Sequence, residues 1–424
     1  MTFKHLLAGL SFFLISGSFA KSENDINTEQ LQKILADKPN TLLIDVRTQT
    51  EIPFMGGSID AANEVNIPRG WLEFRIEDQA KGLDTPIIVY CGTNVRSPPA
   101  AKTLKEMGYT NVLNYADGFQ EWKKQALPIR SPDKAPNSIL YSKPEKILEH
   151  VWSAIGATAP PTYANSGHNN NLSFIITDEG VVVVNAGDNY LIARALHDEI
   201  KTITDKPVKY VVLENGQGHA ILGTSYWQEQ GATVIAHADA AAQIEQYGES
   251  ILGRMQSRTK DKSLGTKLAK PDKTFDGEKH VIKLGGKTIE LLNLGPAHSP
   301  GDIMVWLPED KLIITGDMAF HQRMLPVFEH TNTDGWINTW DRLLALKPEY
   351  VIPGHGAPTN TDEVTKYTKD YLVYMRGEIE KVLDDGGDLN EAYKIDQSAY
   401  AHLHTFKELN LRNAARIFRE MEFE

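Results

Sequence analysis

The chain has 424 residues, a formal net charge of −12 and 41% hydrophobic residues, so it is long enough for two domains that each bury a core. The negative charge and the lack of a basic cluster argue against a nucleic-acid partner. A single cysteine excludes a disulfide within the chain, so stability must come from packed cores.

The N-terminus has the pattern of a secretory signal peptide. Lys4 precedes a short apolar run over residues 6–15, and the small residues Ser18 and Ala20 follow it. We therefore expect a signal peptide over residues 1–20, cleaved after Ala20, and a periplasmic or secreted protein. The alternative is a buried N-terminal helix. The run is too short to span a bilayer, and no other stretch is long and apolar enough. We expect a soluble protein that is not embedded in a membrane.

The only cysteine, Cys91, follows an apolar run over residues 85–90 that predicts a buried parallel strand. Residues 98–104 predict the start of a helix, because proline is tolerated in the first turn. Loop amides, the helix N-terminus and Arg96 would place the thiol in a positive field, which lowers its pKa and stabilises anionic sulfur. The alternative is an unreactive cysteine that fills the core.

Residues 25–130 resemble a single rhodanese domain. The segments that carry the resemblance are residues 43–47, 66–68, 91–96, 108–112 and 118–122. The resemblance implies a small parallel α/β domain in which Cys91 accepts sulfur as a persulfide and passes it to a thiol or another nucleophile. It implies catalytic roles for Cys91, Arg96, Asp45 and Arg47, and a sulfur-binding or anion-binding loop made of Gly92, Thr93, Asn94 and Val95.

The length of this loop bears on its chemistry. The spacing Cys-x4-Arg between Cys91 and Arg96 is one residue shorter than the Cys-x5-Arg loop of the phosphatases related to this fold, which favours sulfur over phosphate. Asn94 stands where the family often has glycine, and asparagine is the next residue best able to adopt a left-handed backbone.

A turn-rich stretch, residues 131–144, predicts a linker to a second domain over residues 145–360. In that domain, the sequence predicts paired strands over residues 172–177 and 181–184, a turn and helix over 187–202, a strand over 210–213, and a hairpin of 280–284 with 289–292. Residues 361–424 are charged and amphipathic, and they predict a helical extension with one break at Gly386 and Gly387.

Three predicted strand ends in the second domain lead into glycine-rich turns that carry a histidine or an aspartate. They are residues 295–302 with His298, residues 312–317 with Asp317, and residues 350–356 with His355. Glycines allow the sharp turns through which ligands from distant segments converge. Together these segments resemble the metallo-β-lactamase fold, an αββα sandwich. Residues 316–320, residues 334–336 and the helical tail look closest to its quinoprotein-relay and sulfur-oxidation branch.

The main metal motif of that fold, His-x-His-x-Asp-His, is not intact in this chain. Anchoring the motif on His219 places Glu214 at the first histidine, and glycines at the second histidine and the aspartate. A slip of one residue would instead place Asn215 and Gln217 at the histidine positions. Asn185 also stands where the family usually has an aspartate that supports the site.

The remaining candidate metal ligands are His219, His298, Asp317 and His355, with Glu214 as a substitute. Zinc needs three protein ligands and a water. These residues therefore allow one zinc or iron ion and leave a metal-free site open, whereas we do not expect a dinuclear hydrolase. The histidines outside this set are expected to be surface or packing residues, among them His168, His237, His321 and His330.

The leading hypothesis is an exported sulfurtransferase that carries persulfide sulfur on Cys91. It would be fused to a metallo-β-lactamase-like domain with a degenerate metal site, and act on small sulfur-containing substrates or thiol acceptors in sulfur-compound metabolism. One alternative is a fusion enzyme resembling a persulfide dioxygenase or a metallohydrolase. Another is a non-catalytic binding or scaffold protein in sulfur or redox trafficking. The sequence leaves the sulfur donor and acceptor open.

Overall fold

A computed structural model describes residues 23–134 and 139–424 of the chain. The predicted signal peptide over residues 1–20 lies outside these residues, as does the middle of the predicted linker. The described chain forms two compact units, one made mainly of residues up to 129 and one of residues from 130 onward with residues 52–57. Among the described residues, no helix combines the length and the apolar character required to cross a bilayer.

The first unit is built on a five-stranded parallel sheet, as the sequence predicts. Its strand order is β1 (Asp25–Ile26), β6 (Val112–Tyr115), β5 (Ile87–Tyr90), β2 (Leu42–Asp45) and β4 (Glu64–Asn66). The helices are α1 (Thr28–Asp37), α3 (Leu72–Arg75), α4 (Ser97–Glu106) and α5 (Gly118–Lys124), whereas α2 (Glu51–Phe54) begins in this unit and its residues from 52 onward group with the second unit. Strands β3 (Ser58–Ile59) and β7 (Ile129–Arg130) are short.

The central strand β5 is buried along its whole length, because parallel strands are covered on both faces. It pairs with β2 on one side and β6 on the other, so its carboxyl end points the chain into the loop that begins at Cys91. Beyond the loop, α4 begins with prolines in its first turn, where a missing amide proton costs no helical hydrogen bond. The predicted order of strand, loop and helix is therefore confirmed.

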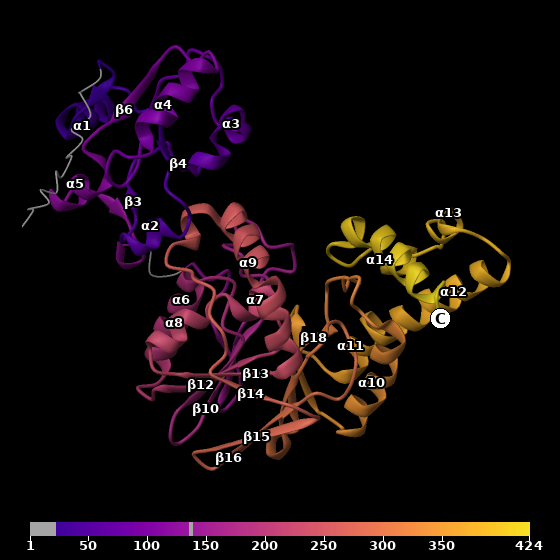
Figure 1. Cartoon of the computed structure of the whole chain (residues 1–424). Helices are drawn as coiled ribbons and strands as arrows, with labels where there is room; N and C mark the ends of the chain where they lie inside the picture. The colour runs from indigo at the N-terminus through magenta and orange to yellow at the C-terminus, as the bar shows by residue number, and fades with distance from the viewer. Residues whose placement is uncertain (1–22, 135–138) are drawn as a thin grey trace, which may run out of the picture. The chain divides into compact units, whose positions relative to one another are not determined.

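The second unit is a sandwich of two sheets with helices on both outer faces (Figure 1). The seven-stranded sheet runs in the order β14 (Lys273–Phe275), β13 (Thr233–His237), β12 (Val208–Leu213), β11 (Val181–Val184), β10 (Leu172–Ile176), β9 (Val151–Ala154) and β8 (Glu145–Leu148). The five-stranded sheet runs in the order β15 (Lys279–Leu284), β16 (Lys287–Leu292), β17 (Met304–Leu307), β18 (Leu312–Phe320) and β19 (Tyr350–His355).

The four valines of β11 show how the layers form. Alternate side chains of a strand point to opposite faces. Val182 and Val184 pack into the core between the two sheets, while Val181 and Val183 pack into the core beneath the helices. Those helices are α6 (Tyr190–Ile203), α7 (Gly218–Ile221), α8 (Thr224–Glu229) and α9 (Ala238–Thr259). A strand that must fill two cores has no polar face, which explains the unbroken valine run.

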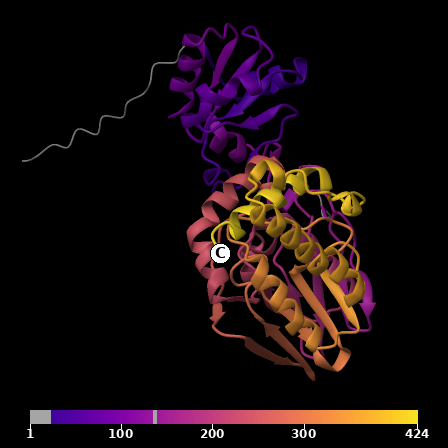
Figure 2. The same ribbon diagram turned by 90° about the vertical axis from the view of Figure 1, so that its right-hand side faces the viewer.

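The C-terminal region is helical, as predicted, and its helices lie over the five-stranded sheet (Figure 2). These are α10 (Thr333–Ala345), α11 (Thr361–Tyr367), α12 (Lys369–Asp384), α13 (Leu389–Ala392) and α14 (Phe406–Met421). They share one apolar core with strand β18. Helix α12 ends at Asp384, so Gly386 and Gly387 lie in the predicted break before α13, and the chain also leaves α-helical structure a second time, between α13 and α14.

Candidate functional sites

The first candidate site is the Cys91 loop at the end of β5. The Cys91 side chain is buried, and its Sγ lies 3.5 Å from the Ser97 hydroxyl. Burial raises the pKa of the Cys91 thiol, but hydrogen bonds from the Ser97 side chain and from the backbone amides of Arg96, Ser97 and Thr93 outweigh that effect, so the net pKa is lowered. This loop therefore favours a thiolate, the reactive form of cysteine.

The rest of the loop is fixed by side-chain contacts. Asn94 has the left-handed backbone expected of it, with φ of 61°. Its Oδ1 accepts a hydrogen bond from the Asn114 amide at 2.9 Å and another from the Ser97 hydroxyl at 3.4 Å. Asn114 lies in β6, so the tip of the loop is tied to the neighbouring strand. Val95 is exposed at the rim.

Arg96 forms an ion pair that the sequence analysis missed. Its guanidinium contacts both carboxylate oxygens of Glu51 in α2, one of them at 2.6 Å, and this pairing holds the pKa of Glu51 near 2. The Arg96 charge is therefore largely balanced by Glu51. The Ser97 hydroxyl and the neutral amides of the loop remain as the main stabilisers of charge on the sulfur. The only sequence signal for Glu51 was an acidic residue at a helix start, which is too common to be informative.

Asp45 and Arg47, which were predicted as catalytic, form a fully buried ion pair at the end of β2. The Arg47 guanidinium also lies over the Phe119 ring, 4.1 Å from its centroid. The Phe119 amide donates a hydrogen bond of 2.9 Å to the Cys91 carbonyl. These contacts give Asp45 and Arg47 a supporting position beneath the loop, and a catalytic role for them stays a prediction.

The second candidate site lies in the sandwich, where the three predicted segments meet. Two of the predicted turns are wrong, because β18 continues through Asp317 to Phe320 with an irregular register around Gly316, and His355 is the last residue of β19. His219, Asp317 and His355 each place a ligand atom within 4.8 Å of the other two, and all three are buried. His355 Nε2 lies 3.1 Å from Asp317 Oδ1, and His219 Nε2 lies 3.5 Å from Asp317 Oδ2. Ligands about 2.0–2.2 Å from a tetrahedral zinc ion are roughly 3.3–3.6 Å apart, so this set fits one ion.

His298 and Glu214 border this group. His298 Nδ1 lies 3.6 Å from Asp317 Oδ2 and 3.1 Å from the Gln217 amide, while its Nε2 is buried without a hydrogen-bond partner. Glu214 Oε1 lies 2.8 Å from His219 Nε2, the same atom that faces Asp317. Glu214 can therefore act as a hydrogen-bond partner of His219 or as a further oxygen ligand.

The residues after β12 carry the altered metal motif, and several of their side chains contact the centre. Asn215 Nδ2 lies 3.3 Å from Asp317 Oδ2, and the Gln217 amide contacts His298. Glu214 also turns inward, against Gly316, where an added Cβ would lie only 2.0 Å from Glu214 Oε2. Residues from both possible registers thus face the centre. Asn185 accepts a hydrogen bond from the Glu214 amide, so it supports the site as a neutral group.

The pKa values of the histidines and of Asp317 in this centre are shifted by burial and by their charged neighbours. Burial alone lowers the pKa of His219, but Asp317 and Glu214 raise it to about 9. Burial lowers the pKa of both His298 and His355 to about 4. Burial raises the pKa of Asp317, but the three histidines more than reverse this and keep it ionised. The centre as described thus carries a carboxylate opposite an imidazolium.

The other histidines pack as expected. His168 is buried, its Nδ1 accepts a hydrogen bond from the Tyr141 amide, and burial lowers its pKa to about 4. His237 is buried at the N-terminus of α9 and accepts a hydrogen bond from the Asp239 amide. His321 Nδ1 donates to the Ala357 carbonyl at 2.7 Å, and His330 packs on the Phe328 ring.

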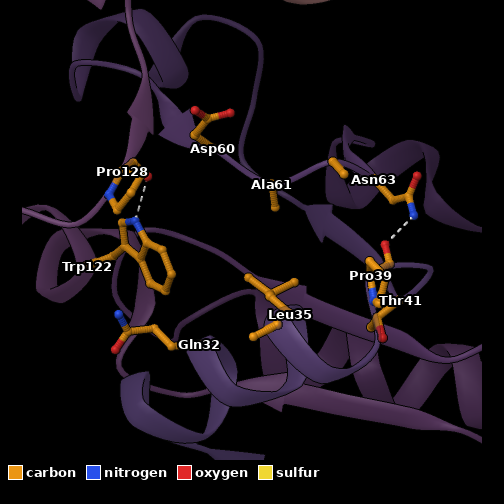
Figure 3. A pocket seen from close by; sticks show the side chains of 11 residues that line it. Gln32, Leu35, Pro39, Thr41, Asp60, Ala61, Asn63, Trp122 and Pro128 are labelled. Carbon is orange, nitrogen blue, oxygen red and sulfur yellow. Dashed lines mark hydrogen bonds between the residues drawn. The ribbon is translucent and has the colours of Figure 1, made fainter.

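A pocket of about 370 Å³ lies elsewhere in the first unit (Figure 3). Its lining is mainly apolar and includes Leu35, Trp122 and Pro128, and the Trp122 indole donates to the Pro128 carbonyl at 2.8 Å. None of its lining residues belongs to the Cys91 loop. Its lining contains no cysteine, serine or histidine, so we do not assign it to the chemistry of this unit.

Comparison with known proteins agrees with the division of the chain into two domains. The model of the rhodanese-like domain matches residues 27–125, and that of the metallo-beta-lactamase superfamily matches residues 219–355. The chain is 34% identical over 110 residues to a protein named sulfurtransferase from Allochromatium vinosum, covering 26% of this chain and 97% of that protein. The chain belongs to the rhodanese family through its first domain, and a metallo-beta-lactamase superfamily domain follows.

The second domain has more distant relatives. It is 23% identical over 210 residues to the metallo-beta-lactamase type 2 of Bacteroides fragilis, covering 47% of this chain and 76% of that protein. A double mutant of a sec-alkyl sulfatase has a similar fold, with a TM-score of 0.53 and 16% identity over 66% of this chain and 50% of that chain. The protein is thus a rhodanese-type sulfurtransferase domain fused to a metallo-beta-lactamase-like domain.

Proposed function

We propose that this protein is an exported sulfurtransferase whose Cys91 carries sulfur as a persulfide, and whose second domain holds at most one metal ion in a degenerate site. The observation that carries the proposal is the buried Cys91 thiol surrounded by the amides of Thr93, Arg96 and Ser97, which lower its pKa. The similarity to a protein named sulfurtransferase supports the same class of reaction. The protein would act on small sulfur-containing donors and thiol acceptors.

The proposed reaction has two displacements at sulfur. The Cys91 thiolate attacks the outer sulfur of a donor such as thiosulfate, the sulfur–sulfur bond of the donor breaks, and sulfite leaves with the bonding electron pair. Cys91 then carries a persulfide anion. An acceptor thiolate attacks its outer sulfur, forms an acceptor persulfide and restores the Cys91 thiolate. The charge on the cysteine is the same before and after loading, so the same amides stabilise both states.

Intact mass measurement tests this proposal directly. The full chain is expressed in a host that exports proteins, incubated with thiosulfate and compared with Cys91→Ser. We expect one added sulfur atom on the wild type and none on the variant, and subsequent cyanide should remove the added sulfur as thiocyanate. The same mass shows whether residues 1–20 have been removed. Absence of added sulfur on the wild type, or equal addition on Cys91→Ser, would refute sulfur transfer and favour a binding or scaffold role.

For the second domain, His219, Asp317 and His355 would hold the metal, with Glu214 and His298 beside it. Two imidazoles and one carboxylate suit zinc. A bound ion would supply a Lewis acid to a sulfur-bearing or ester-like substrate. Elemental analysis of the purified chain should find no more than one equivalent. Two equivalents would favour the alternative, a metallohydrolase fusion enzyme, which the convergence of the three buried ligands also supports.

A further inference from the structure

Glu51 occupies the guanidinium of Arg96, which is the only basic side chain of the loop over residues 91–97. Arg96 Nη1 donates to Glu51 Oε2 at 2.6 Å, and Arg96 Nη2 donates to Glu51 Oε1, so the two side chains form a bidentate pair. A guanidinium binds a carboxylate and other oxyanions through the same fork of donors. Glu51 therefore takes the two donors that would serve the charged oxygens of an anionic sulfur donor.

Glu51 is also held in position from its own side of the pair. The Thr48 amide donates to Glu51 Oε2 at 3.0 Å, and the Thr48 hydroxyl donates to the same oxygen at 2.8 Å. Hydrogen bonds from Arg96 lower the pKa of Glu51 to about 2, so the carboxylate is ionised at neutral pH. Glu51 is thus a fixed negative charge at the start of α2, and it is not displaced by rotation of a free side chain.

The guanidinium lies within electrostatic reach of the sulfur. The Arg96 backbone amide donates to Cys91 Sγ. Hydrogen bonds to Glu51 raise the pKa of Arg96, and charge on Cys91 adds to this rise. The side chain of Arg96 is 35% exposed and that of Glu51 is 33% exposed. A molecule that binds over the loop therefore meets both side chains, which together carry no net charge.

The rest of the loop offers no cation in place of Arg96. Residues 92–95 are uncharged, and Val95 presents an apolar side chain that is 68% exposed. Beneath the loop, Arg47 is fully buried and paired with Asp45. A sulfur donor is thus recognised by neutral amides and an apolar rim, with no unbalanced positive charge to attract a second anionic oxygen.

We propose that Glu51 is a specificity-determining residue that selects the sulfur donor of Cys91. By occupying Arg96, it disfavours donors with two negative charges, such as thiosulfate. It favours donors in which an organic group replaces a charged oxygen, such as thiosulfonates. The inference rests on the proposed sulfur transfer and names the class of donor for that same site.

Two donors of similar size isolate the effect of one charge. The Cys91 thiolate attacks the outer sulfur of methanethiosulfonate, the sulfur–sulfur bond breaks, and methanesulfinate leaves with the bonding electron pair. Thiosulfate reacts in the same way and releases sulfite. Methanethiosulfonate has a methyl group and a single negative charge, whereas thiosulfate has an oxygen in place of the methyl group and a second charge.

The half-saturating donor concentration for loading of Cys91 provides the test. It is measured on the full chain with each donor, from the intact mass of samples quenched over time. Glu51→Gln removes the charge but keeps an acceptor for Arg96, whereas Glu51→Asp keeps the charge. Two unit charges about 4 Å apart interact by about 1 kcal/mol in water, which is about fivefold in an equilibrium constant. We therefore expect Glu51→Gln to lower the half-saturating concentration of thiosulfate at least about fivefold more than that of methanethiosulfonate. Glu51→Asp should stay closer to the wild type.

Glu73→Gln is the matched control, because Glu73 pairs with Arg69 at 2.8 Å in the same domain, with similar exposure, and lies outside the loop. Circular dichroism confirms that each variant is folded. An unchanged ratio of the two donor concentrations in folded Glu51→Gln would overturn the inference, as would an equal change in Glu73→Gln, while sulfur on Cys91 would leave the proposed sulfur transfer standing. Loading of the wild type by neither donor would remove both.

The wild type alone completes the test if the Glu51 variants fail to fold. Salt screens an unbalanced charge at the surface much more than a paired one. We expect the half-saturating thiosulfate concentration of the wild type not to rise between about 20 and 200 mM salt. A rise of about threefold or more would reveal an unbalanced cation at the loop and contradict the role of Glu51.

Discussion

Removing the Ser97 hydroxyl should raise the pKa of the Cys91 thiol. The hydroxyl lies 3.5 Å from Cys91 Sγ and is among the groups that lower this pKa. A hydrogen bond to a charged group contributes about 1.5–3 kcal/mol. We expect the Ser97 hydrogen bond to lie near the lower end of this energy range, because the contact is long and because Asn94 Oδ1, 3.4 Å from the same hydroxyl, competes as an acceptor. At about 1.4 kcal/mol for each pKa unit, Ser97→Ala should raise the thiol pKa by roughly one unit.

The assay is simple because Cys91 is the only cysteine in the chain. The ultraviolet absorbance of the thiolate, followed across pH with Cys91→Ser as the baseline, gives the pKa directly. Below that pKa, a rise of one unit lowers the thiolate fraction about tenfold, and the initial rate of sulfur loading from thiosulfate should fall by a similar factor. Val95→Ala is the control, since Val95 is exposed in the same loop. An unchanged pKa in Ser97→Ala, or an equal change in Val95→Ala, would show that the backbone amides alone tune the thiol.

Two further predictions concern the second domain. Gly316→Ala should destabilise the protein by about 1–3 kcal/mol in urea unfolding, because φ is 53° at Gly316 and the new Cβ would lie 2.0 Å from Glu214 Oε2. The control is Gly253→Ala, in open space on α9, which should be neutral or slightly stabilising. Equal stabilities of the two variants would contradict this prediction. In the presence of a chelator, the free energy of unfolding should fall as pH rises from about 6.5 to 9. The folded pKa of His219 is raised from 6.5 to about 9, so its stabilisation, at most about 3 kcal/mol, is complete below the lower value and lost above the higher one. In His219→Gln, the free energy of unfolding should change much less between pH 6.5 and 9. An unchanged dependence on pH in this variant would rule out His219 as the cause.

The sequence predicted best the features that depend on strand ends. Cys91 follows the buried strand β5 as predicted, and the strands predicted before Asp317 and His355 are present as β18 and β19, although both strands include those residues. A strand is recognisable from a short stretch of residues, and its carboxyl end fixes where the next side chain lies. The alternation of strands and helices predicted the parallel sheet of the first domain, whereas the sandwich of the second was implied by the resemblance to the metallo-β-lactamase fold.

The partners of these residues were not predictable, because they come from distant parts of the chain. Glu51 lies 45 positions before Arg96, and the Asn169 carbonyl lies 186 positions before His355. Such contacts are set by tertiary packing, which a single sequence does not reveal without an alignment.

The register of the altered metal motif was open for a different reason. Alternation of side chains decides register only within a strand, and β12 ends at Leu213, before the first altered position. Glu214 and Asn215 are neighbours, yet both contact the centre, which an extended strand would not allow. The chain after β12 turns, so neither register alone describes which side chains face Asp317.

The ion pair between Arg96 and Glu51 bears on the proposed sulfur transfer. At Cys91, Glu51 neutralises Arg96, so uncharged amides stabilise the sulfur. A strong cation beside the thiolate would also retain the anionic donor and the sulfite that leaves, and so slow turnover. An amide loop stabilises the thiolate and the persulfide anion about equally, because each carries one negative charge at the end of the same side chain.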